Sequence, residues 1–172
     1  MQRVSILGMG NVLMGDDGAG PYAAAVLAAR YRLPENVAVL DIGTPGLDLA
    51  PYLAEADILL MLDTVHSDAP AGSIRTYDKP ALMRQKLQPR LSPHDPALGQ
   101  CLTTLEMAGC APREMLLVGI VPQRTSFGTG LSDPVQNAIA AAVARVVEEL
   151  ESRNIHLEAL DVPEPPDIWW EA

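Results

Sequence analysis

Acidic side chains stand at the ends of three apolar segments of the sequence. Asp16 and Asp17 come shortly after the first segment. Asp41 closes the second, and Asp63 closes the third. Short apolar runs of this kind predict strands of a parallel sheet, whose carboxyl ends meet at one edge, where ligands bind. We therefore expect these carboxylates to converge on one rim of the sheet.

Two of these carboxylates and one histidine have the ligand types of a transition-metal site. Asp17, Asp63 and His94 would offer oxygen and nitrogen atoms that suit a divalent ion such as nickel or zinc. Three protein ligands leave coordination positions open for a substrate. His66 lies close after Asp63 and is a competing ligand, whereas His156 lies near the C-terminal end and is a poor candidate.

The same residues also have purely structural interpretations. Asp16 and Asp17 can stabilise the start of a helix through its dipole. Asp63 can accept backbone hydrogen bonds at a strand end, and His94 can be an ordinary residue of a first helical turn. Residue types alone therefore leave a metal site and structural roles open as alternatives.

Other common active-site patterns are incomplete in this sequence. Gly8 and Gly10 begin a dinucleotide fingerprint, but Leu13 occupies the position of its third glycine. The carboxylates that follow would also repel a pyrophosphate. Ser92 and Ser126 have no flanking G-x-S-x-G motif, which disfavours a serine hydrolase.

The periodicity of apolar residues predicts the elements that would position these side chains. The strands are expected over residues 4–9, 37–41, 58–63, 72–77 and 114–121, the fourth as a half-exposed edge strand. The helices are expected from Asp16 or Asp17 to 31, and over 47–56, 81–87, 94–107 and 133–151. Ser132 is expected to cap the last helix. The alternation of the first three strands with helices predicts an α/β fold with a parallel sheet.

The composition is that of an ordinary globular protein. Hydrophobic residues make up 48% of the 172 residues, and the net charge is −10. So acidic a surface repels nucleic acids and anionic membranes, and no apolar run approaches the roughly 20 residues that cross a bilayer. We therefore expect a cytoplasmic protein with neither nucleic acid nor a membrane as partner.

The chain is expected to form one α/β domain over residues 1–160, followed by a Pro-rich, acidic tail over 161–172. The adjacent Trp169 and Trp170 are unusual for a loose tail. They either pack back onto the domain or form a contact surface. Cys101 and Cys110 are too far apart for a disulfide and are expected as thiols in the core.

Six segments carry motifs whose order and spacing together are specific. They span residues 8–20 (GMGNVLMGDDGAG), 41–47 (DIGTPGL), 60–65 (LMLDTV), 91–94 (LSPH), 118–122 (VGIVP) and 130–132 (GLS). In this order they resemble the hydrogenase maturation endopeptidases, over about residues 3–150.

The resemblance implies a three-layer α/β sandwich, with a mostly parallel, mixed five-stranded sheet between helices. It implies a metal-dependent, aspartic-type endopeptidase. Such an enzyme removes the C-terminal extension of a nickel-iron hydrogenase large-subunit precursor after nickel insertion. The metal ligands would be Asp17, Asp63 and His94. The nickel would be supplied by the substrate as a recognition anchor, and cadmium or zinc would be able to replace it in vitro.

The resemblance links the second motif with substrate recognition, which assigns Asp41, Gly43 and Thr44 to substrate binding. Some family members carry Glu at the first ligand position, so that Asp16 and Asp17 both stand as candidates for this ligand. The hydrolytic step would use a metal-polarised water or carbonyl, or a carboxylate such as Asp16 as general base. The alternatives are a non-enzymatic nickel-checking chaperone and a related protease that acts on another protein.

Overall fold

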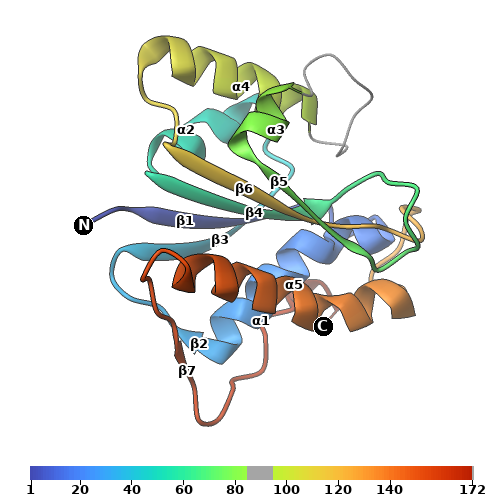
Figure 1. Ribbon diagram of the computed structural model, residues 1–172. Helices are drawn as coiled ribbons and strands as arrows, with labels where there is room; N and C mark the ends of the chain where they lie inside the picture. Colours follow the sequence, from blue (N-terminus) through green and yellow to red (C-terminus); the bar gives the residue numbers. More distant parts are fainter. Residues whose placement is uncertain (85–94, 172) are drawn as a thin grey trace.

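A five-stranded sheet forms the centre of the computed structural model, which describes residues 1–84 and 95–171 (Figure 1). The strand order is β3-β1-β4-β6-β5. From edge to edge the strands are β3 (Val37–Gly43), β1 (Val4–Met9), β4 (Ile58–Thr64), β6 (Glu114–Ile120) and β5 (Ile74–Asp78). Neighbouring strands run parallel except β5, which is antiparallel to β6. The mixed, mostly parallel five-stranded sheet is therefore confirmed.

The two central strands are buried along their whole length. Every residue of β1 and β4 is buried, because a strand covered by helices on both faces needs apolar side chains on both. Successive side chains point to opposite faces, so that Leu60 joins the core cluster around α1 and Met61 joins the cluster around α4. At the edge of the sheet, β5 is half-exposed, as its alternating sequence predicts.

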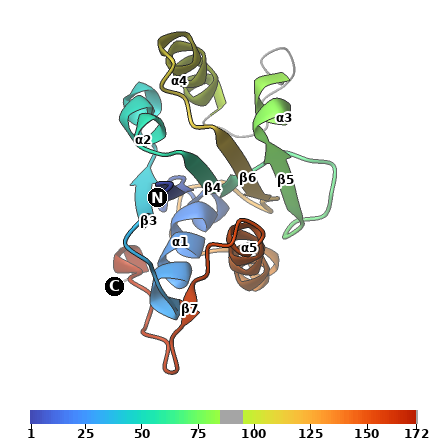
Figure 2. The ribbon, with the colours of Figure 1, turned by 60° about the vertical axis from the view of Figure 1, so that its left-hand side comes forward.

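Helices cover both faces of the sheet and complete three layers (Figure 1, Figure 2). One face carries α1 (Ala19–Arg30) and α5 (Asp133–Glu151). The other carries α2 (Ala50–Ala54), α3 (Lys79–Arg84) and α4 (Asp95–Ala108). The three-layer α/β sandwich is thus confirmed. None of the helices within the described ranges is long and apolar enough to cross a membrane.

The start of α1 presses directly against the carboxyl ends of β1 and β4. A Cβ atom at Gly20 would lie 2.1 Å from the carbonyl oxygen of Met9 and 2.3 Å from that of Leu62. No residue larger than glycine fits at such distances. The close approach fixes the turn before α1 above the strand ends, which is where the sequence concentrates its carboxylates.

Two helices begin differently from the prediction. The first opens with a 3-10 turn, η1 (Gly15–Gly18), in which the N–H groups of Gly15 and Asp16 donate to the loop after β6. The helix expected over 47–56 is a 3-10 turn, η2 (Gly46–Leu49), followed by the short α2. Pro51 has no N–H to donate, which interrupts a continuous helix at this point.

Two further features depart from the prediction. A small second sheet pairs β2 (Tyr31–Arg32) with β7 (Glu158–Ala159), and neither strand has a periodic pattern in the sequence.

Cys101 is buried, as expected, but Cys110 is exposed. The prediction of a core thiol at Cys110 is wrong because α4 ends before this residue and no longer holds it against the sheet.

The last residues pack on the outer side of α1. Trp170 is 8% exposed and meets the ring of Tyr22 edge to face, with ring centroids 5.4 Å apart. The Tyr22 hydroxyl donates a hydrogen bond to the carboxylate of Glu171. The neighbouring Trp169 is 64% exposed. The packing of Trp170 confirms that the tail docks back onto the domain, while a contact surface at Trp169 and the division of the chain at residue 160 stay predictions.

Candidate active site

Three aspartates are buried at the carboxyl ends of the parallel strands. Asp16 and Asp17 lie in η1, and Asp63 is the last residue but one of β4. Their exposed fractions are 0%, 6% and 1%. Burial of a carboxylate costs free energy unless donors or cations surround it. The partners of each aspartate therefore decide what that aspartate can do.

Asp16 is fully enclosed by donors from the loop after β6. Its Oδ2 accepts hydrogen bonds from the backbone N–H groups of Gln123 and Arg124, both at 2.8 Å. Ser132 donates twice, from its backbone N–H to Oδ1 at 2.7 Å and from its hydroxyl to Oδ2 at 2.9 Å. Both carboxylate oxygens are thus engaged, and Asp16 ties the 3-10 turn to a loop more than 100 residues away.

These hydrogen bonds also set the charge of Asp16. Burial raises the pKa of Asp16, but the hydrogen bonds from Ser132, Arg124 and Gln123 outweigh it and hold the pKa below the ordinary value of an aspartate. Ser132 is the N-cap residue of α5, as predicted, but its side chain makes no capping hydrogen bond and its hydroxyl donates to Asp16. The position of the N-cap thus follows from the local sequence, whereas the partner of its hydroxyl lies in a distant segment.

Asp17 has a different environment on the other side of the same turn. Its Oδ2 accepts a hydrogen bond from the backbone N–H of Asn11 at 2.9 Å. Its Oδ1 accepts one from the hydroxyl of Thr64 at 3.2 Å. These two donors come from the loop after β1 and from the end of β4. Asp17 therefore lies at the junction of the two central strands, as the sequence predicts.

Thr64 connects Asp17 with Asp63. The backbone N–H of Thr64 donates to Oδ1 of Asp63 at 2.7 Å, while its hydroxyl donates to Asp17. A single residue thus bonds to both carboxylates that the sequence assigns to a metal site. The predicted approach of Asp17 and Asp63 at one rim of the sheet is confirmed.

The residues assigned to substrate binding lie at the exposed edge of the same rim. Asp41 is exposed at the end of β3, and its Oδ1 accepts a hydrogen bond from the N–H of Gly43 at 3.0 Å. The carbonyl of Gly43 accepts from Gly10 at 2.9 Å, which holds this turn beside the loop that leads to Asp17. Thr44 follows and is exposed. The turn is therefore accessible to a protein substrate.

Two apolar side chains are exposed on the other flank of the rim. Leu13 lies in the loop before η1, and Phe127 lies in the loop after β6. The backbones of the two loops are joined where the N–H of Gly128 donates to the carbonyl of Leu13 at 2.9 Å. Exposed apolar side chains beside a polar site suit contact with another protein.

The histidine of the predicted triad, His94, lies outside the described residues. Within the ranges that are described, no group of three His, Cys, Asp or Glu side chains is arranged to hold a metal ion. The competing candidate His66 is exposed two residues after Thr64. The metal triad therefore stays a prediction, of which the structure brings two members together.

Gln123 and Arg124 carry no sequence signal that would have found them, whereas Thr64 and Ser132 lie in the motifs over 60–65 and 130–132. Thr64, Ser132, Gln123 and Arg124 all donate to the aspartates, two of them from the backbone alone. A backbone donor can belong to any residue type, so no motif identifies it. Thr64 follows the strand-end aspartate of its motif directly.

The fold matches solved endopeptidase structures. The hydrogenase maturating endopeptidase HybD from Escherichia coli superimposes with a TM-score of 0.85 and 28% sequence identity, over 91% of this chain and 97% of that chain. The hydrogenase maturation protease HybD from Thermococcus kodakarensis superimposes with a TM-score of 0.69 and 29% identity, over 86% and 98%. The arrangement of sheet, helices and strand-end loops is thus that of a maturation endopeptidase.

Sequence comparison gives the same class of protein and identifies the family within it. A family model described as hydrogenase maturation protease, HycI, matches residues 21–149. The hydrogenase 2 maturation protease of Escherichia coli K12 is 32% identical over 157 residues, which are 89% of this chain and 93% of that protein. The hydrogenase expression/formation protein HupD of Rhodobacter capsulatus is 35% identical over 160 residues, 91% and 75% of the two chains. The chain belongs to the HycI family of hydrogenase maturation proteases.

Proposed function

We propose that this chain is an endopeptidase that removes the C-terminal extension of a nickel-loaded hydrogenase large-subunit precursor in the cytoplasm. The substrate's own nickel serves as the recognition anchor. The observation that carries the proposal is the pair Asp17 and Asp63, buried at the carboxyl ends of β1 and β4 and joined through Thr64. Family membership supplies the reaction class.

Asp17, Asp63 and His94 are the proposed ligands of the incoming nickel. Two carboxylates and an imidazole suit a divalent transition metal, and three ligands leave positions for groups of the precursor. Cadmium or zinc would replace nickel in vitro on the same ligand chemistry. Asp17 fits this role better than Asp16, because Thr64 joins Asp17 to Asp63, whereas the donors to Asp16 come from the loop after β6.

Asp16 is poorly suited to act as the general base of the hydrolytic step. A base must accept a proton readily, whereas the lowered pKa of Asp16 makes its carboxylate a weak base. We assign Asp16 instead to holding η1 against the loop after β6. Polarisation of the scissile carbonyl or of a water by the anchored nickel then supplies the chemistry of the cut.

Recognition of the precursor is assigned to the exposed flanks of the rim. Asp41, Gly43 and Thr44 form an accessible turn on one side. Leu13 and Phe127 offer apolar contacts on the other. A protein chain that enters between these flanks would pass directly over Asp17 and Asp63.

The test measures the mass of a hydrogenase large-subunit precursor after incubation with this protein, with and without prior nickel loading. We expect loss of a C-terminal peptide only from the nickel-loaded precursor. Asp63→Asn should abolish the cut, whereas the matched change Asp161→Asn at an exposed position should leave it intact. Cleavage of both precursor forms at equal rates would overturn the role of nickel as anchor.

Two other outcomes separate the alternatives. Nickel-dependent binding of the precursor without any loss of mass would indicate a checking chaperone. Neither binding nor cleavage of hydrogenase precursors would indicate a protease for another protein.

A further inference from the structure

Thr64 occupies a position between the two buried carboxylates that the proposed reaction does not itself use. It is the last residue of β4 and is 1% exposed. A threonine side chain has a strongly restricted χ1 angle, so its hydroxyl direction follows from the backbone. The backbone of β4 at this point is fixed by its parallel pairing with Ile120 of β6.

The two hydrogen bonds of Thr64 act on different carboxylates. Its hydroxyl donates to Oδ1 of Asp17 at 3.2 Å, and its N–H donates to Oδ1 of Asp63 at 2.7 Å. The other oxygen of Asp17 accepts from Asn11, so that a donor from the loop after β1 and one from the end of β4 hold this carboxylate at both oxygens. The orientation of one carboxylate relative to the other therefore depends on Thr64.

We propose that Thr64 is a positioning residue that sets the mutual orientation of Asp17 and Asp63 for a divalent transition-metal ion. Donors behind ligating carboxylates orient them and tune their affinity, and their loss weakens metal binding by about 10–100-fold. The inference deepens the proposed function and rests on its metal ligands, but it does not depend on peptide cleavage.

The test uses two variants of the full chain. Thr64→Val keeps the shape and the N–H of the residue and removes only the hydroxyl, whereas Thr64→Ser keeps the hydroxyl. The control is Thr76→Val on the exposed edge strand β5. Titration calorimetry with Ni²⁺ alone gives the Kd of each variant, and thermal unfolding gives its Tm.

We expect Thr64→Val to raise the Kd for Ni²⁺ by at least about tenfold, with Thr64→Ser within about threefold of the wild type and Thr76→Val unchanged. A purely structural role would lower the Tm of Thr64→Val and leave its Kd unchanged, which would overturn the inference. Absence of Ni²⁺ binding by the wild type would overturn it as well. If the Kd values change as expected and no precursor is cut, the inference stands and the protease function fails.

Discussion

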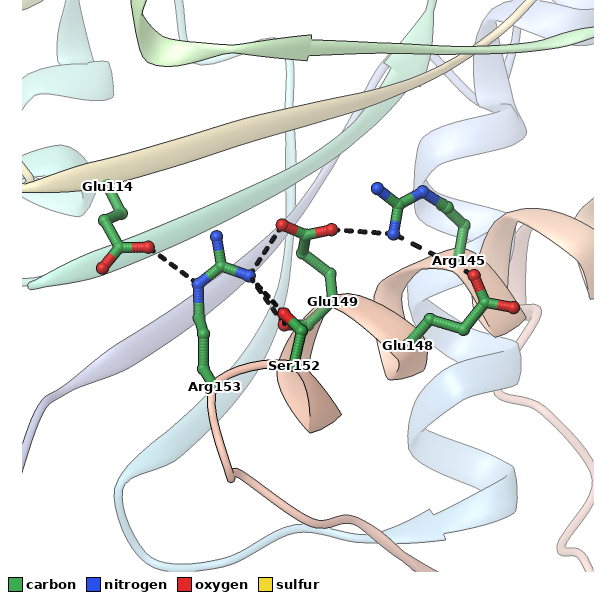
Figure 3. A network of polar contacts seen from close by, with 6 residues as sticks. All are labelled: Glu114, Arg145, Glu148, Glu149, Ser152 and Arg153. Atoms are coloured by element: carbon green, nitrogen blue, oxygen red, sulfur yellow. Dashed lines mark hydrogen bonds and ion pairs between the residues drawn. The ribbon is translucent and has the colours of Figure 1, made fainter.

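The carboxylates at the two ends of the parallel sheet have different kinds of hydrogen-bond partner. At the amino-terminal end, Arg153 binds Glu114 at 2.8 Å and Glu149 at 2.7 Å, and Arg145 binds Glu149 at 2.7 Å (Figure 3). At the carboxyl-terminal end, the donors to Asp16 among the described residues are backbone N–H groups and a hydroxyl. One end pairs acids with guanidinium groups, and the other surrounds an acid with neutral dipoles.

This difference separates a stabilising role from a binding role. A guanidinium neutralises the carboxylate that it binds, so the amino-terminal end gains stability and keeps little net charge. A neutral donor fixes the direction of a carboxylate without cancelling its charge. The carboxyl ends of the strands therefore keep a negative potential that attracts a cation. Four predictions test this contrast.

The largest effect is expected for Asp17→Asn. An amide is a poorer metal ligand than a carboxylate, so kcat/KM for the nickel-loaded precursor should fall by at least about 100-fold, the upper end of the loss that follows removal of a group behind the ligands of a metal site. The control is Asp48→Asn, an exposed aspartate in η2. Cleavage assays and thermal unfolding together give the result. Full activity of Asp17→Asn would remove the functional distinction between the two ends.

The next effect is a loss of stability in Asp16→Ala. The donors from Gln123, Arg124 and Ser132 would lose their acceptor, which should lower the free energy of unfolding by about 3 kcal/mol. Urea denaturation measures it. Asp16→Asn, which keeps one acceptor oxygen, should lose less. A change below about 1 kcal/mol would show that the loop after β6 is held by other contacts.

A smaller loss is expected at the amino-terminal end. Arg153→Met breaks a partly exposed ion-pair network and should lower the free energy of unfolding by about 1 kcal/mol without changing cleavage. Arg32→Met, which breaks the exposed pair with Glu158, should have almost no effect. Loss of activity in Arg153→Met would contradict the assignment of this end to stability alone.

The smallest effect depends on pH. Burial raises the pKa of Glu149, but the hydrogen bonds and charges of Arg153 and Arg145 lower it by more than burial raises it. The folded-state pKa of Glu149 therefore lies below the ordinary value of a glutamate. The stability gained from Glu149 is therefore present above the ordinary glutamate pKa of 4.5 and is lost as the pH falls through the folded-state pKa. Thermal unfolding should show Glu149→Gln less stable than the wild type at pH 6. The difference should shrink as the pH falls below the ordinary glutamate pKa, and a constant difference would contradict this origin.

The sequence predicts the positions of those site residues that lie at or near the ends of the strands. The segments over 4–9 and 58–63 are continuous apolar runs, and only strands covered on both faces bury such runs completely. The ends of parallel strands lie at one rim, so the approach of Asp17 and Asp63 follows. The place of β5 at one edge follows from its alternating pattern, whereas the sequence analysis does not predict the place of β3 at the other edge.

The remaining parts depend on contacts between distant segments. Ser132 donates to Asp16 across 116 residues from its N–H and its hydroxyl, and the local sequence predicts only that Ser132 is the N-cap residue of α5. The role of Thr64 depends on where η1 places Asp17. Periodicity describes one element at a time, so it does not predict a hydrogen bond that joins two elements.

The docking of the last turn on α1 has a consequence for spectroscopy. The chain has two tryptophans, and both lie in the final 3-10 turn, η4 (Trp169–Glu171). Trp170 is packed against Tyr22, so its emission is shielded from water until the turn leaves α1. Intrinsic tryptophan fluorescence therefore reports release of this turn, whereas circular dichroism reports melting of the helices. The two signals will coincide only if the turn and the domain unfold as one cooperative unit.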